Sequence, residues 1–148
     1  MNRDYVEMLS ALHDAGAEFL IVGAHAVAAH GRPRATGDLD IWVSPTPENA
    51  DRVWSALHAF GAPLVDLTRQ DLTSADLVFQ IGVVPARIDI MTGVSGVGFD
   101  EAWAERVTLR LSGLEVPVIG RDALIRNKRA AGRPRDLADV AELEGEQE

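Results

Sequence analysis

Three aspartates carry the strongest chemical signal in this sequence. Asp38 and Asp40 lie at alternate positions of the otherwise apolar segment 38–43, and Asp89 lies in a second alternating segment, 86–91. Side chains at i and i+2 of a strand share one face, so Asp38 and Asp40 repel each other unless a cation lies between them. Mg²⁺ suits this place, because it prefers a few carboxylates together with substrate phosphates. If the two strands are neighbours, the aspartates surround one or two ions that activate an attacking oxygen and hold a triphosphate for in-line transfer.

A glycine turn upstream predicts a docking place for the phosphates. The short apolar strand 18–22 ends at Gly23, and an alanine-rich helix, 24–30, follows. A glycine at a helix start allows close backbone approach, and the first N–H groups of a helix attract anions. Arg34 and Thr36, just before the aspartates, offer a charge-assisted contact and a hydroxyl.

The remaining pattern predicts the elements that position these residues. Apolar spacings of three and four predict an amphipathic helix that ends near Gly16, and Thr46 and Pro47 supply the N-cap and first residue of another. Two alternating segments separated by Gly82 and Pro85 predict an antiparallel hairpin. The expected elements are, in order, a helix from 5 to near 16, a strand over 18–22, a helix over 24–30, a strand over 38–43, a helix over 47–60, strands over 77–81 and 86–91, a helix over 99–106, strands over 108–111 and 114–118, and helices over about 122–131 and 135–143.

Length and composition indicate one globular domain. A chain of 148 residues with 47% apolar and 25% charged residues is neither disordered nor fibrous. The absence of cysteine excludes disulfide scaffolds, thiolate zinc sites, iron–sulfur clusters and cysteine nucleophiles. No apolar run approaches the roughly 20 residues of a membrane helix, and the first residues lack a signal-peptide core. We therefore expect a cytoplasmic protein that contacts no membrane, with a single domain over 1–143 and an acidic tail over 144–148.

The charge balance narrows the set of partners. A net charge of −9 argues against a protein that coats nucleic acid non-specifically, because such binding needs many lysines and arginines. Six of the 14 basic residues nevertheless lie between positions 121 and 135, which predicts a local phosphate-binding surface. Lys128, in that segment, is the one lysine of the chain.

These motifs together resemble a known superfamily. Gly23, then Asp38-Leu39-Asp40, then Arg87-Ile88-Asp89-Ile90 resembles the nucleotidyltransferases of DNA polymerase beta type. The segments 21–26 and 34–40 are more closely similar to AbiEii-type toxin nucleotidyltransferases, and the similarity covers positions 19–143. A later motif of that group joins a lysine to an Arg-x-x-Asp-x-x-Asp helix. The residues that match this motif are Lys128, Arg133, Arg135, Asp136 and Asp139.

The resemblance implies both a fold and a reaction. The fold is of the α/β (α+β) class, with a mixed β-sheet flanked by helices. Two Mg²⁺ ions on Asp38, Asp40 and Asp89 would support transfer of a nucleoside monophosphate from an NTP to a hydroxyl. Lys128 would touch the phosphates, and Asp136 would orient Lys128 or Arg133. The implied nucleotide-binding residues are Gly23, Ala24, Arg34, Thr36, Lys128, Arg133 and Asp136. Ala24 departs from the usual Gly-Ser turn and removes one hydroxyl contact to phosphate.

Several alternatives remain open at this level. Lys128 and Asp136 are equally interpretable as a surface ion pair, and Trp42 either stacks on a base or covers a sheet edge. The leading function is the toxin of a toxin–antitoxin pair acting on tRNA. The alternatives are an antitoxin-type enzyme that adenylylates a partner toxin, and a non-catalytic module that binds a nucleotide or a protein. A manganese-dependent glycosyltransferase fits less well, since those folds need well over about 200 residues.

Overall fold

A six-stranded mixed sheet forms the centre of the protein. The computed structural model describes residues 2–31, 37–83 and 86–145, and within them the strand order is β3-β4-β2-β1-β6-β5. The strands are β1 (Phe19–Val22), β2 (Leu39–Val43), β3 (Val78–Ile81), β4 (Ile88–Met91), β5 (Val107–Leu111) and β6 (Leu114–Val118). β1 pairs antiparallel with β2 and parallel with β6, whereas β2 pairs parallel with β4. The two outer pairs, β3 with β4 and β5 with β6, are antiparallel hairpins, the first of which was predicted.

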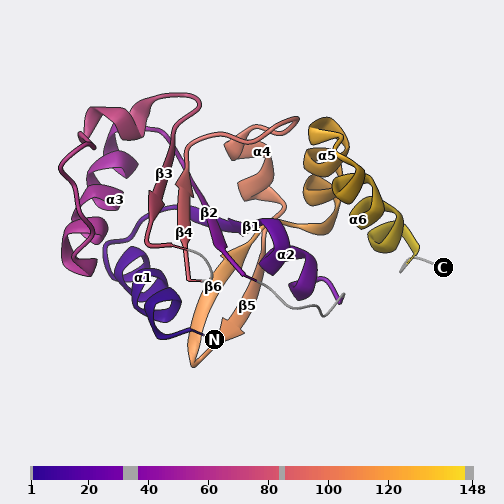
Figure 1. The fold of residues 1–148 in the computed structure, drawn as a ribbon, viewed down its shortest axis with the longest axis horizontal. Coiled ribbons are helices and arrows are strands. Elements are labelled where there is room, and N and C mark those ends of the chain that lie inside the picture. The colour runs from indigo at the N-terminus through magenta and orange to yellow at the C-terminus, as the bar shows by residue number, and fades with distance from the viewer. Residues whose placement is uncertain (1, 32–36, 84–85, 146–148) are drawn as a thin grey trace.

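Helices flank this sheet. They are α1 (Arg3–Asp14), α2 (Gly23–Ala29), α3 (Pro47–Phe60), α4 (Phe99–Ala104), α5 (Arg121–Ala131) and α6 (Pro134–Gly145), with a 3₁₀ turn, η1 (Gln70–Thr73). Figure 1 shows α1 beside α3, and α5 beside α6, with the strands between the two pairs. A mixed sheet flanked by helices was the predicted fold class, and the structure has it.

A buried asparagine ties α3 to the sheet. Thr46 caps the helix by accepting a hydrogen bond from the Asn49 backbone N–H at 3.2 Å. The Asn49 side chain is 2% exposed; its amide nitrogen donates to the carbonyls of Glu18 and Ser44, and its oxygen accepts from the Glu18 N–H at 2.7 Å. These bonds fix the start of α3 against the beginning of β1 and the end of β2, which satisfies three buried backbone groups at once.

Trp42 belongs to the core. Its side chain is 1% exposed and packs edge to face against Phe99, with ring centroids 5.2 Å apart. A tryptophan covered in this way does not reach a nucleotide base, so the expectation that it stacks on one is wrong. Trp54 and Trp103 are partly buried and pack against this core.

Two features differ from the sequence pattern. The η1 turn was not predicted, and α6 continues through Gly145, past the expected start of the acidic tail. Across the described ranges, no helix combines the length and the apolar character needed to cross a bilayer.

Candidate active site

The sheet register brings the aspartates together. β2 and β4 are parallel neighbours in which Asp40 lies directly opposite Asp89, and Asp38 lies one residue before β2. The condition set by the sequence, that these two strands be adjacent, is therefore met. Asp89 is 8% exposed, so at least one carboxylate of the cluster is removed from bulk water.

Arg87 links two of the three carboxylates. Its Nη2 lies 2.6 Å from Oδ2 of Asp38, and its Nε lies 3.0 Å from Oδ1 of Asp89. One guanidinium therefore neutralises part of the charge on both strands. The sequence places Arg87 two residues before Asp89, on the same face, but the role of counter-ion was not predicted.

The cluster carries more negative charge than this one arginine balances. Burial raises the pKa of Asp40 to about 6, and the charges of Asp89 and Asp38 add to the rise, against the opposing effect of Arg87 and Lys128. Burial also raises the pKa of Asp89, while Arg87 lowers it. Excess negative charge of this kind is the electrostatic condition in which a cation binds.

Gly23 makes room for Asp40. Val22 lies opposite Asp40 in the β1–β2 ladder, and the chain turns at Gly23, with φ of +67°, into α2. A Cβ on Gly23 would lie 2.2 Å from Oδ2 of Asp40, which no side chain tolerates. Two features of this position therefore favour glycine: the left-handed backbone conformation and the close approach of the Asp40 carboxylate. Ala24 is the second residue of α2, and no side-chain hydrogen bond caps this helix.

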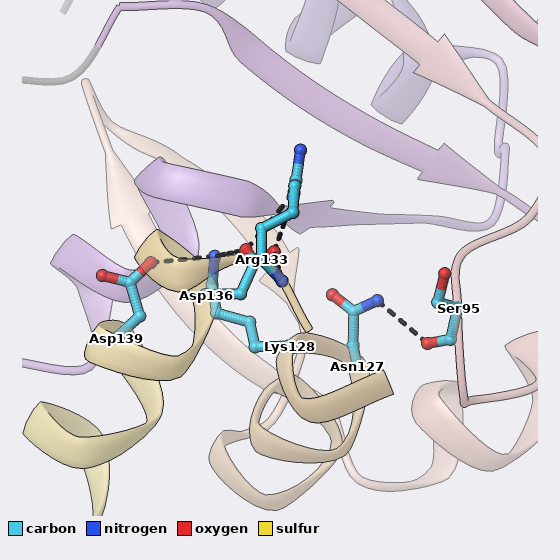
Figure 2. A network of polar contacts seen from close by, with 6 residues as sticks. All are labelled: Ser95, Asn127, Lys128, Arg133, Asp136 and Asp139. Atoms are coloured by element: carbon cyan, nitrogen blue, oxygen red, sulfur yellow. Dashed lines mark hydrogen bonds and ion pairs between the residues drawn. The ribbon is translucent and has the colours of Figure 1, made fainter. Parts of the chain in front are cut away.

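Lys128 belongs to an ionic network that also contains Arg133, Asp136 and Asp139 (Figure 2). Its Nζ lies 3.0 Å from Oδ2 of Asp139 and 3.4 Å from Oδ1 of Asp136, and Asp136 also accepts from Nε of Arg133 at 2.6 Å. Lys128 is 8% exposed and Asp136 1%, so the alternative of a surface ion pair is wrong. Burial disfavours the charge on Asp136, but hydrogen bonds from Arg133 and the charge of Lys128 outweigh it and hold its pKa below the ordinary value.

This network acts on the aspartate cluster. The charge of Lys128 lowers the pKa of Asp40. The hydrogen bond to Asp136 raises the pKa of Arg133, and the charge of Asp40 adds to that rise. The charges of Lys128 and Arg133 are therefore felt at Asp40, so the network and the aspartate cluster are electrostatically coupled.

Tyr5 is a residue that the sequence did not single out for the site. Its hydroxyl donates to the carbonyl of Gly37 at 2.7 Å and lies 3.4 Å from the carbonyl of Arg87. Gly37 precedes Asp38, and Arg87 precedes Asp89 by two residues, so one side chain of α1 contacts both chain segments that lead to the carboxylates. A helical tyrosine in an apolar stripe gives no sequence signal for such a long-range contact.

Two predicted residues, Arg34 and Thr36, lie outside the described residues. In the described part of the chain no group of three His, Cys, Asp or Glu side chains is arranged to hold a metal ion as it stands. The donor chemistry nevertheless fits Mg²⁺: three carboxylates share one arginine, and the buried Oδ1 of Asp89 accepts no well-aligned hydrogen bond. Asp38, Asp40 and Asp89 would hold the ion once Arg87 turns away.

A cavity of about 460 Å³ lies elsewhere. It is lined by residues such as Phe19, Arg52 and Trp103, at the opposite end of β1 from Gly23, and none of the three aspartates borders it. This cavity is therefore separate from the aspartate cluster, which lies on the interior strands β2 and β4.

Comparison with known proteins bears on the fold. No family model matches the chain. No curated protein matches it either. Solved structures do match: a candidate nucleotidyltransferase from Thermotoga maritima superposes with a TM-score of 0.60 at 16% identity, covering 99% of this chain and 96% of the other.

Two antibiotic-modifying enzymes match equally well. The lincosamide adenylyltransferase LnuA, with lincomycin bound, has a TM-score of 0.61 at 12% identity, over 97% of this chain and 96% of its own. ANT(2″)-Ia, in complex with adenylyl-2″-tobramycin, has a TM-score of 0.64 at 14% identity, over 97% of this chain and 87% of its own. These likenesses show that the chain has the nucleotidyltransferase fold.

Proposed function

We propose that this protein is a Mg²⁺-dependent nucleotidyltransferase that transfers a nucleoside monophosphate from an NTP to a hydroxyl. The observation that carries the proposal is the register of β2 and β4, which places Asp40 opposite Asp89, with Asp38 beside them, in a nucleotidyltransferase fold. Such a cluster, with cations nearby, is what in-line phosphoryl transfer requires, because its catalysis is mostly positioning and charge stabilisation.

In this proposal the residues of the site have different roles. Asp38, Asp40 and Asp89 hold Mg²⁺, which when bound neutralises phosphate charge and polarises the attacking hydroxyl. Gly23 lets the triphosphate approach the backbone at the start of α2. Arg133, whose side chain is 58% exposed, is the accessible cation for the phosphates.

Lys128 acts from a more buried position. An ammonium has three N–H donors, and two of them are directed to Asp136 and Asp139, which leaves the third for a phosphate oxygen. Asp136 is a positioning residue, because it holds both Lys128 and Arg133.

For the acceptor we propose RNA, with the protein acting as a toxin on tRNA. Six of the 14 basic residues lie between 121 and 135 in a chain of net charge −9. Four of them pair with carboxylates of the same chain, so RNA binding would require these cations to exchange partners for phosphates. A hydroxyl on a partner toxin or antitoxin protein is the alternative acceptor. A module that binds nucleotide without catalysis is the alternative function.

The test pairs transfer with nucleotide binding. Each α-labelled NTP is incubated with Mg²⁺, the protein and total tRNA, alongside the variants Asp89→Asn and Asp66→Asn, the latter exposed and remote from the site. We expect label on tRNA with wild type and Asp66→Asn and none with Asp89→Asn. Equal labelling by Asp89→Asn would refute the metal-site assignment. Mg²⁺-dependent NTP binding by calorimetry without transfer to RNA would shift the acceptor to a protein, and absence of NTP binding would leave the non-catalytic module.

A further inference from the structure

The contact between Arg87 and the aspartates has two unequal halves. With Asp38 it is short, 2.6 Å from Nη2 to Oδ2. With Asp89, Nε lies 3.0 Å from Oδ1, yet both atoms are buried without a well-aligned hydrogen bond. The better-aligned contact is longer, 3.4 Å from Nη2 to Oδ2 of Asp89. The contact between Arg87 and Asp89 is thus mainly electrostatic, because the two side chains do not form a short, well-aligned hydrogen bond.

Guanidinium and metal need the same oxygens. Arg87 contacts Oδ2 of Asp38 at 2.6 Å and Oδ1 of Asp89 at 3.0 Å, so its positive charge lies between the two carboxylates and repels an ion that would bridge them. Within the described residues, no group of three His, Cys, Asp or Glu side chains is already arranged to hold a metal ion. The two cations are therefore alternative occupants of one cluster of carboxylates.

We propose that Arg87 is the internal cation of the nucleotide-free site, and that divalent metal binds only when its guanidinium leaves Asp38. This inference rests on the proposed function and assigns a regulation of that same site. Arg87 screens the aspartates while the site is empty of nucleotide, and it lowers the affinity for metal alone. The triphosphate then supplies a new anionic partner for the released guanidinium, so metal and nucleotide bind as one unit.

The test measures Mn²⁺ binding to the nucleotide-free protein by electron paramagnetic resonance of the free ion. Arg87→Gln removes the charge at similar length, and Arg87→Lys keeps the charge without the two-pronged geometry. Arg69→Gln is the matched control, since Arg69 pairs with Asp51 at the surface, where their side chains are 59% and 60% exposed. We expect Arg87→Gln to bind Mn²⁺ at least about tenfold more tightly than wild type, equivalent to about 1.4 kcal/mol. Arg87→Lys should lie between them, and Arg69→Gln should equal wild type.

The outcomes separate this inference from the proposed function. If wild type binds Mn²⁺ and Arg87→Gln binds it no more tightly, Arg87 does not compete and the inference is wrong, while the metal site stands. If neither protein binds Mn²⁺, the metal site of the proposed function fails. A tightening as large in Arg69→Gln would assign the effect to net charge and overturn the inference. Should Arg87→Gln not fold, Arg87→Lys decides: affinity equal to wild type overturns the proposal.

Discussion

Asp40→Asn should stabilise the metal-free protein at neutral pH, although it removes a residue of the proposed site. The folded protein raises the pKa of Asp40 from 3.8 to about 6. At about 1.4 kcal/mol per pKa unit, keeping this carboxylate ionised costs the fold about 3 kcal/mol above pH 7. Because Asp40 keeps some solvent contact, we expect a gain of about 1–3 kcal/mol in the free energy of unfolding.

The pH dependence has a defined sign. A carboxyl whose pKa is higher in the folded state favours the fold when protonated, so this contribution is present at low pH and is lost as pH rises from 3.8 through about 6. The advantage of Asp40→Asn over wild type should therefore be full at pH 7.5, fall to roughly half near pH 5 and be nearly gone at pH 4. A stability difference between Asp40→Asn and wild type that does not change with pH would mean that packing, and not charge, causes the difference.

Urea unfolding in EDTA, from pH 4 to 8, measures this effect. Asp66→Asn is the control, since it removes the same charge from an exposed position. Adding Mg²⁺ together with an NTP should stabilise wild type at pH 7.5 and leave Asp40→Asn unchanged. If Asp40→Asn is no more stable than wild type at pH 7.5, the cluster does not carry the excess charge argued above.

Three further substitutions test the scaffold. Gly23→Ala should lower the free energy of unfolding by about 1–3 kcal/mol more than Gly16→Ala does. Both glycines have φ near +70°, but only at Gly23 would the added Cβ contact Asp40. Equal losses of stability in a thermal melt would show that the Asp40 carboxylate moves aside without cost. Lys128→Met removes the buried cation that Asp136 and Asp139 share, while Arg133 still pairs with Asp136, and should cost about 3–5 kcal/mol in urea unfolding; a loss under about 1 kcal/mol would contradict the buried network. Asn49→Ala removes three hydrogen bonds to backbone groups, one of which, the Glu18 carbonyl, keeps another partner in the Ser44 N–H, and should cost about 2–4 kcal/mol by the same assay; a near-neutral effect would mean that water replaces the side chain.

Local patterns explain most of what the sequence predicted. Alternation placed Asp38 and Asp40 on one face of a strand, and the glycine at position 23 marked a turn into a helix. The β3–β4 hairpin followed from two short segments with turn residues between them. Each of these features depends on residues close in the chain, where steric and periodic rules act directly.

The features that were missed depend on residues far apart in the chain. Tyr5 contacts Gly37 and Arg87, which are 32 and 82 residues away, and no periodic pattern encodes such contacts. The burial of Lys128 follows from the packing of α5 on α6. The residue types alone were therefore equally consistent with an exposed ion pair between Lys128 and Asp136. The parallel pairing of β2 with β4 was stated only as a condition, because α3, η1 and β3 intervene between those strands.

The aspartate cluster and the ionic network differ in the balance of their charges. In the network, Lys128 and Arg133 face Asp136 and Asp139, so charges balance and the cations are held in place without a ligand. In the cluster, three carboxylates face Arg87, and burial, together with the charges of Asp89 and Asp38, raises the pKa of Asp40, so the ionised form of Asp40 destabilises the fold. On the proposed function, a divalent cation bound to Asp38, Asp40 and Asp89 would remove the cost of keeping these carboxylates ionised, so the unfavourable arrangement of the metal-free cluster would itself favour metal binding.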